Sequence, residues 1–140
     1  KLETVSIFGK EYPVVCFEGI CHLIVDETKE TEDFSRESFT GQAMPCLSEF
    51  SQEAYGIMFL NQNHLIPVVY VVSTQSLVWE SSCGSGSVAC AWWLWQKTAD
   101  EKSRYEFSEP GGTLIVTCQK TPEGLCILMG GTVTVVEVTD

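Results

Sequence analysis

Residues 80–95 constrain the fold more than any other stretch of this chain. They join a loop rich in glycine and serine to the apolar segment 91–95, and they follow a β-branched run that ends at Trp79. Their spacing predicts a helix over residues 86–98, with Cys83 in the turn that opens it. Apolar side chains occur all around this helix, which indicates burial on most sides. Other elements of the fold must therefore cover it.

The turn around Cys83 combines a thiol with features that bind anions. The first N–H groups of a helix have no acceptor within the helix, and their field favours a thiolate over a thiol. We therefore expect a lowered pKa for Cys83. Gly84 and Gly86 leave the backbone open to a ligand, while Ser85 and Ser87 can cap the helix or donate to a carboxylate. The alternative is a buried, inert cysteine in a tight connection.

The rest of the chain predicts mainly short β-strands. Pro67 lies within one of the predicted strands and indicates an edge or a bulge. The acidic residues 26–37 predict a solvated loop or the start of a short helix, and residues 44–50 predict one or two helical turns. One buried helix among many strands, without strand–helix–strand alternation, predicts an α+β fold in a single domain, residues 1–140. The predicted strands are residues 5–8, 12–17, 21–25, 56–60, 65–72, 77–79, 104–107, 113–118, 125–128 and 132–138.

Composition argues against several classes of protein. Hydrophobic residues make up 44% of the 140 residues, which is typical of a globular domain. The net charge is −11 and the basic residues are scattered, so we expect neither a nucleic-acid nor a membrane partner. No apolar run approaches the ~20 residues of a membrane span, and the first residues lack a signal-peptide pattern. We therefore expect a soluble, cytoplasmic protein.

The cysteines do not form a recognisable metal motif. There are seven, an odd number, without a Cys-x-x-Cys pair. The two histidines, His22 and His64, stand far apart in the sequence, so we expect no metal ion. Free thiols in a reducing compartment are the simplest expectation. Cys90, two helical turns beyond Cys83, is expected to be a packing residue.

Three motifs resemble, in the same order, those of the diaminopimelate epimerase family of cofactor-independent amino-acid racemases and epimerases. Residues 83–86 (Cys-Gly-Ser-Gly) match the family's second cysteine motif position by position. Residues 19–26 look like its Gly-Asn-Pro-His strand, with His22 at the functional histidine. Residues 110–114 and 129–133 look like its Pro-Gly-Gly turn and final hairpin. The chain thus resembles the C-terminal half of a two-domain member, which implies a strongly curved, mostly antiparallel sheet wrapped around one central helix.

The resemblance implies a mechanism that needs no cofactor. In the family, two cysteines exchange the α-proton on opposite faces of the amino acid, and each lies at the start of the central helix of its own domain. Cys83 would be one of them, and the helix N-terminus would bind the substrate carboxylate. No other cysteine lies in a Gly-rich turn that opens a second apolar helix. We therefore expect the second thiol in a missing N-terminal domain or a partner chain, and an inactive isolated chain; a homodimer stays open.

Further residues are candidates for the site. The resemblance places His22 near Cys83 or the substrate, and the alternative is a strand histidine satisfied by the core or the surface. Glu80, three residues before Cys83, is expected to tune the thiol or to receive the substrate ammonium, with a solvated carboxylate as the alternative. Thr74 and Gln75 are expected to face the substrate side chain.

Departures from the family motifs bear on the substrate. Where diaminopimelate epimerases hold the distal amino-acid group, this chain has Ile20, Ala54, Thr74 and Gln75. A second zwitterion would lack paired partners there. Residues 80–86 look instead like the histidine racemases of opine-type metallophore synthesis, so we expect a single amino acid such as histidine. Two alternatives remain, a related isomerase with an acidic residue in place of thiols and a non-catalytic binding or assembly domain.

Overall fold

The computed structural model describes the backbone of residues 2–129 and 134–137, and the side chains of residues 2–129. Residues 130–133, part of the expected final hairpin motif, and Val138 of the last predicted strand lie outside the described residues. The elements follow in the order β1 (Leu2–Ile7), β2 (Lys10–Phe17), β3 (Ile20–Asp26), η1 (Glu27–Lys29), α1 (Arg36–Leu47), η2 (Ser48–Phe50), β4 (Ala54–Asn61), β5 (His64–Val71), β6 (Ser76–Trp79), α2 (Gly84–Gln96), β7 (Lys102–Glu109), β8 (Gly112–Thr121), β9 (Gly124–Met129) and β10 (Thr134–Glu137).

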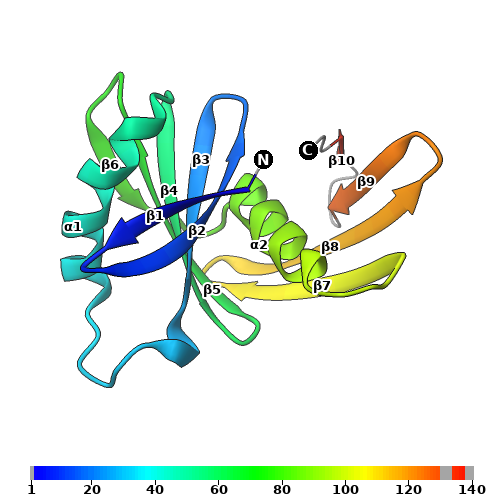
Figure 1. The fold of residues 1–140 in the computed structure, drawn as a ribbon, viewed down its shortest axis with the longest axis horizontal. Coiled ribbons are helices and arrows are strands. Elements are labelled where there is room, and N and C mark those ends of the chain that lie inside the picture. The colour runs from blue at the N-terminus through cyan, green and yellow to red at the C-terminus, as the bar shows by residue number, and fades with distance from the viewer. Residues whose placement is uncertain (1, 130–133, 138–140) are drawn as a thin grey trace.

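The strands share one open sheet (Figure 1). Their order is β1-β2-β3-β4-β5-β7-β8-β9-β10, and β6 pairs with β5 beside this path. The described neighbours are antiparallel except for β3 with β4 and a single residue pair, His64 with Ser108, that joins β5 to β7. The prediction of an α+β fold with a mostly antiparallel sheet is confirmed, but the sheet is open and uncurled, not strongly curved around one central helix as the resemblance implied.

Strand β3 is buried on both faces. Leu23 belongs to a core that includes Phe39 of α1. The next residue, Ile24, belongs to a second core that includes Trp92 of α2. Successive side chains of a strand point to opposite faces, so the continuous apolar run of β3 reflects a helix on each side.

The expectation of one helix is wrong, because α1 covers the second face. The Ser35 hydroxyl caps its first turn, and Phe39, Ala43 and Leu47 form its buried stripe. Residues 44–50, expected to form one or two turns, contain the last turn of α1 and all of η2. The buried side of α1 also includes the polar Thr40, and Pro45 lies inside the helix, so its apolar periodicity is weak in the sequence.

Helix α2 packs between strands from both parts of the sheet. Its buried residues share a core with Met58 of β4 and Val116 of β8. Figure 1 shows α2 between the β1–β5 strands and the β7–β9 strands. The predicted burial on most sides is confirmed, although the helix begins at Gly84 rather than at Gly86. The buried residues of α2 are Gly86, Ser87, Val88, Ala89, Cys90, Ala91, Trp92 and Trp95.

Pro67 does not mark an edge strand. Strand β5 has β4 on one side and both β6 and β7 on the other. Pro67 falls between Val68, which pairs with β6, and His64, which pairs with β7, so the missing N–H lies where that ladder is interrupted. Its carbonyl group accepts the Glu80 N–H at 2.9 Å.

Two of the seven cysteines are not free thiols, contrary to expectation. Cys16 and Cys21 form a disulfide between β2 and β3, where they are direct partners with Cα atoms 4.1 Å apart. Cys90 is free and fully buried, as predicted. The other free cysteines among the described residues are Cys46, Cys83, Cys118 and Cys126.

The packing at Gly56 predicts a measurable loss of stability on Gly56→Ala. The added β-carbon would lie 2.6 Å from Nδ1 of His22 and 3.0 Å from Cε of Met58, and both side chains are fully buried. We expect urea denaturation to show a decrease of about 1–3 kcal/mol in the free energy of unfolding. Gly41→Ala in α1 is the matched control, because open space surrounds that position. It should increase stability by about 0.5–1 kcal/mol, and a similar gain from Gly56→Ala would contradict the packing.

Candidate functional site

Cys83 is the N-cap residue of α2, which fits its predicted place in the turn that opens the helix. Its backbone is extended, with φ −142° and ψ 108°, and its Sγ accepts the Gly86 N–H at 3.3 Å. Helices prefer Ser, Thr, Asp or Asn at this position, because an oxygen is a better acceptor than a thiol sulfur. The thiol is therefore a weak cap, but it gains the favourable field of the helix start for its ionised form.

The glycines of the turn allow close packing. A β-carbon at Gly86 would lie 2.2 Å from Sδ of Met58, so this position has room for glycine alone. We expected the backbone at Gly86 to be open to a ligand. The Gly86 N–H instead donates to the sulfur of Cys83. The N–H groups of Gly84 and Ser85 precede the first backbone hydrogen bond of the helix and have no acceptor within it.

A buried carboxyl group that sequence reasoning missed lies beside Cys83. Glu109, the last residue of β7, is 6% exposed. Its Oε1 accepts the Cys83 N–H at 3.0 Å, and its Oε2 lies 2.7 Å from Oγ of Ser87. The Gly111 N–H also donates to the Ser81 carbonyl at 2.6 Å, which fixes the β7–β8 turn against the Cys83 loop. The one sequence signal was an acidic residue directly before the Pro-Gly-Gly turn.

The pKa of the Cys83 thiol is raised, so the expected lowering is not observed. Burial is the largest cause. Hydrogen bonds from Ser85 and from the Gly86 backbone oppose it, whereas the negative charges of Glu109 and Glu80 add to it. Burial also raises the pKa of Glu109, and its contacts with the Ser87 hydroxyl and the Cys83 N–H oppose this rise.

His22 is fully buried in β3. Both ring nitrogens lack a hydrogen-bond partner among the described residues, and burial lowers the pKa to about 4. The ring faces Gly56 of the neighbouring strand. Met58 packs against both Gly56 and Gly86, so it lies between the ring and the start of α2. His22 is therefore neither at the surface nor satisfied by the core.

Strand β6 lies between Glu80 and the other two candidate residues, Thr74 and Gln75. Glu80 follows β6, is half-buried, and acts on Cys83 through its charge. Thr74 and Gln75 lie in the exposed turn before β6, where Gln75 has a φ of 51°. The four residues of β6 span about 13 Å. The structure therefore does not bring Thr74 and Gln75 beside the Cys83 loop.

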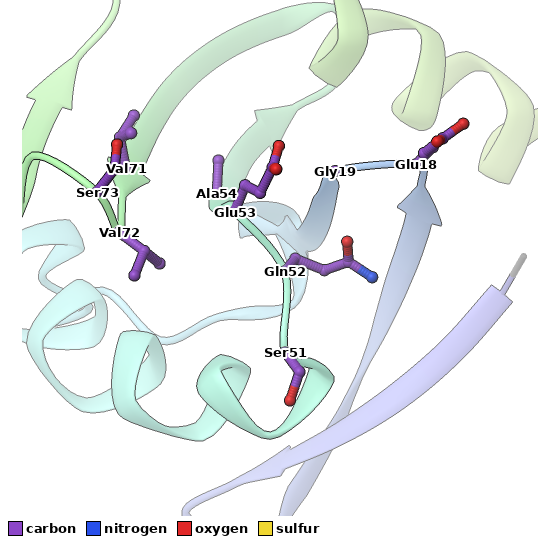
Figure 2. Close-up of a pocket in the computed structure, with 9 residues that line it drawn as sticks. All are labelled: Glu18, Gly19, Ser51, Gln52, Glu53, Ala54, Val71, Val72 and Ser73. Carbon is purple, nitrogen blue, oxygen red and sulfur yellow. The ribbon is translucent and has the colours of Figure 1, made fainter.

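A cavity of about 940 Å³ opens at the end of the sheet where β3 and β4 begin. Figure 2 shows its lining, which comes from the turn before β3, the segment before β4 and the end of β5. Two carboxylates, Glu18 and Glu53, belong to this lining. His22 and Gly56 stand near the same ends of β3 and β4. Cys83 does not line the cavity.

The reactive groups described so far are a thiol, a buried carboxyl group and a buried imidazole. Within residues 2–129, no three His, Cys, Asp or Glu side chains come close enough to hold a metal ion. Neither helix in that part of the chain is long and apolar enough to cross a membrane.

Comparison with known proteins identifies the family. The model of the histidine racemase CntK N-terminal domain matches residues 3–138. The chain belongs to this family. It is 34% identical over 115 residues to a histidine racemase of Fusobacterium nucleatum subsp. nucleatum (strain ATCC 23726), covering 81% of this chain and 43% of that protein. It is 31% identical over 110 residues to a histidine racemase of Staphylococcus aureus (strain Mu50), covering 76% of this chain and 39% of that protein.

These matches refine the expectation from the motifs. The resemblance to histidine racemases is confirmed. The chain spans about two fifths of the length of these curated relatives. The matching family is described as an N-terminal domain, whereas the motifs pointed to a C-terminal half. A cysteine at the start of a central helix is expected in both halves, so that motif does not distinguish them.

The burial of His22 predicts that acid destabilises the fold. The pKa falls from about 6.5 in the unfolded chain to about 4 in the folded one, so the unfolded chain takes up the proton first. Its contribution to stability is complete above pH ~6.5, and roughly 3 kcal/mol is lost as the pH falls to ~4. His22→Phe keeps a ring and removes the titration. We expect urea denaturation at several pH values to show a smaller acid loss for this variant.

The exposed His64 provides the matched control. His64→Phe should keep the wild-type pH dependence of the free energy of unfolding. An acid loss in His22→Phe equal to that of the wild type would show that His22 is not buried in its neutral form.

Proposed function

We propose that this chain is the half of a cofactor-independent amino-acid racemase that carries one of its two acid–base thiols, Cys83. The observation that carries the proposal is the thiol at the N-cap of α2, with the Gly86 N–H donating to its sulfur. This hydrogen bond favours the thiolate that must remove an α-proton. The relatives' description as histidine racemases supports histidine as the substrate.

The proposed chemistry follows from the geometry of the helix start. Loss of the α-proton leaves a negative charge that spreads into the substrate carboxylate, which needs donors already in place. The N–H groups of Gly84 and Ser85 are the proposed donors. The Cys83 thiolate takes the proton on one face of the α-carbon, and a second thiol delivers a proton to the other face. The α-carbon is inverted, Cys83 has gained a proton, and the second thiol has lost one.

The second thiol is proposed to come from another domain. Among the described free cysteines other than Cys83, Cys46 and Cys90 lie within helices and Cys118 and Cys126 within strands, so none opens a helix. Because the matching family is an N-terminal domain, we place the missing domain after this one in the polypeptide, not before it. The isolated chain is then inactive as a racemase. Packing of α2 between the two parts of the sheet supports a diaminopimelate epimerase-like domain.

The acidic cavity is the proposed place for the imidazole side chain of the substrate. Glu18 and Glu53 line it, and a carboxylate is complementary to an imidazolium group. Ser73, which also lines it, directly precedes Thr74 and Gln75. The structure does not bring these two residues beside the Cys83 loop, so we do not propose them as contacts of a histidine bound there.

His22 and Glu80 are proposed to tune the site without transferring protons to the substrate. Glu80 acts on Cys83 through its charge. His22 lies behind Met58 and has no exposed surface, so it affects the thiol through packing.

A non-catalytic binding domain is the second candidate function. The raised pKa of Cys83 favours it, because this domain alone holds little thiolate at neutral pH. Alkylation of Cys83 separates the two candidates. A catalytic thiol in the full-length protein reacts near neutral pH and is protected by histidine, whereas a structural thiol stays inert.

Cys83→Ser in the full-length protein is expected to slow proton exchange at the α-carbon of histidine by about 10²–10⁴-fold, because a serine hydroxyl does not ionise near neutral pH. Proton NMR in D₂O measures this exchange directly. Cys46→Ser, at a half-buried thiol in α1, is the matched control and should exchange at the wild-type rate. Wild-type exchange in Cys83→Ser would refute the acid–base role.

Glu53→Gln tests the acidic cavity. Loss of one charged partner should raise KM for histidine by about tenfold, and alkylation of Cys83 should stay unchanged. Glu49→Gln, an exposed residue of η2 outside the cavity lining, is the matched control. An unchanged KM in Glu53→Gln would exclude this cavity as the binding site for the imidazole side chain.

A further inference from the structure

Three oxygen atoms beside the start of α2 make two close contacts. Oγ of Ser87 lies 2.7 Å from the carbonyl oxygen of Cys83 and 2.7 Å from Oε2 of Glu109. Both distances are those of O–H···O hydrogen bonds, so each contact needs a proton. The Ser87 hydroxyl carries one proton and serves one contact. The second proton must come from another group.

We propose that Glu109 is held in its protonated form and is a positioning residue that fixes Cys83 at the start of α2. Its carboxyl O–H donates to Oγ of Ser87, the Ser87 hydroxyl donates to the Cys83 carbonyl, and the Cys83 N–H donates to Oε1 of Glu109. Every polar atom of this ring then has a partner. With an ionised Glu109, two oxygen acceptors would face each other at 2.7 Å without a proton.

The surroundings of Glu109 support the protonated form. The side chain is 6% exposed, and none of the ion pairs among the described residues involves it. Among the described side chains, the titratable groups that face it are the thiols of Cys83 and Cys90 on α2, and Glu80 acts on Cys83 from the loop before α2. Burial without a cation disfavours the charged carboxylate and raises the pKa of Glu109.

The proton also affects the thiol. A charged Glu109 is one of the groups that raise the pKa of Cys83, so a neutral Glu109 removes that contribution. This inference rests on the proposed role of Cys83 where it concerns catalysis. The protonation of Glu109 can be measured without substrate. A failure of this inference and a failure of the racemase proposal therefore give different results.

The first experiment measures where Glu109 titrates. Carbon-13 NMR of the full-length protein, labelled at the glutamate side-chain carboxyl groups, follows every glutamate, and the signal lost in Glu109→Gln identifies this residue. We expect this signal to remain that of a protonated carboxyl group at neutral pH, where the exposed glutamates give the signals of carboxylates. A carboxylate signal from Glu109 at neutral pH would overturn the proposal. If Glu109→Gln does not fold, Ser87→Ala moves the same signal and supplies the assignment.

The second experiment measures the rate of Cys83 alkylation by iodoacetamide against pH. A glutamine amide can donate to Oγ of Ser87 and accept the Cys83 N–H, so Glu109→Gln reproduces the protonated form. We expect a neutral-pH rate within about twofold of the wild-type rate, and loss of the inflection that ionisation of Glu109 gives the wild-type profile. A rate increase of about fivefold or more would show that Glu109→Gln removes a negative charge, and would overturn the proposal.

Ser87→Ala is the companion variant for positioning. It removes the shared hydroxyl and leaves Glu109 without its acceptor, so the midpoint of Glu109 should fall toward that of the exposed glutamates. Glu106→Gln, on the same strand but half-exposed in an ion pair with Arg104, is the matched control and should leave the Cys83 profile unchanged. An unchanged Glu109 midpoint in Ser87→Ala would also contradict the ring of hydrogen bonds.

Discussion

The contact between the Cys83 N–H and the Glu109 carboxyl group sets the geometry of the whole site. It joins the helix that carries the thiol to the end of β7, 26 residues further along the chain. The position of the sulfur therefore depends on the pairing of β7 with β8 as well as on α2 itself. A second contact, between Gly111 and Ser81, holds the same turn against the loop from the other side. The site is built by tertiary structure, although its motif is local.

Close packing explains why the thiol differs from the simple expectation. The sequence predicted a lowered pKa because a helix start favours a thiolate. The glycine at position 86, however, lets α2 approach Met58 so closely that the sulfur loses much of its solvent. Desolvation then outweighs the two hydrogen bonds that favour the charged form.

The elements that the sequence predicted well are those with a strong apolar pattern. Helix α2 and most strands have such a pattern, and the Cys83 turn follows from local residue types. Helix α1 was missed because its buried stripe is short and includes the polar Thr40, and because Pro45 lies within it. Glu109 was missed because its approach to Cys83 is a long-range contact that no local pattern encodes. The Cys16–Cys21 disulfide could have been predicted, because the short turn between β2 and β3 places these residues directly opposite each other.

Charge balance at the helix start explains why a neutral Glu109 suits the proposed reaction. A substrate carboxylate bound to the Gly84 and Ser85 N–H groups brings one negative charge close to Cys83, and the thiolate is a second. An ionised Glu109 would add a third in a region without a described cation, and like charges at short range disfavour ionisation of the thiol. A protonated Glu109 still holds the Cys83 backbone and adds no charge. The field of the helix start then acts on the substrate and the sulfur alone.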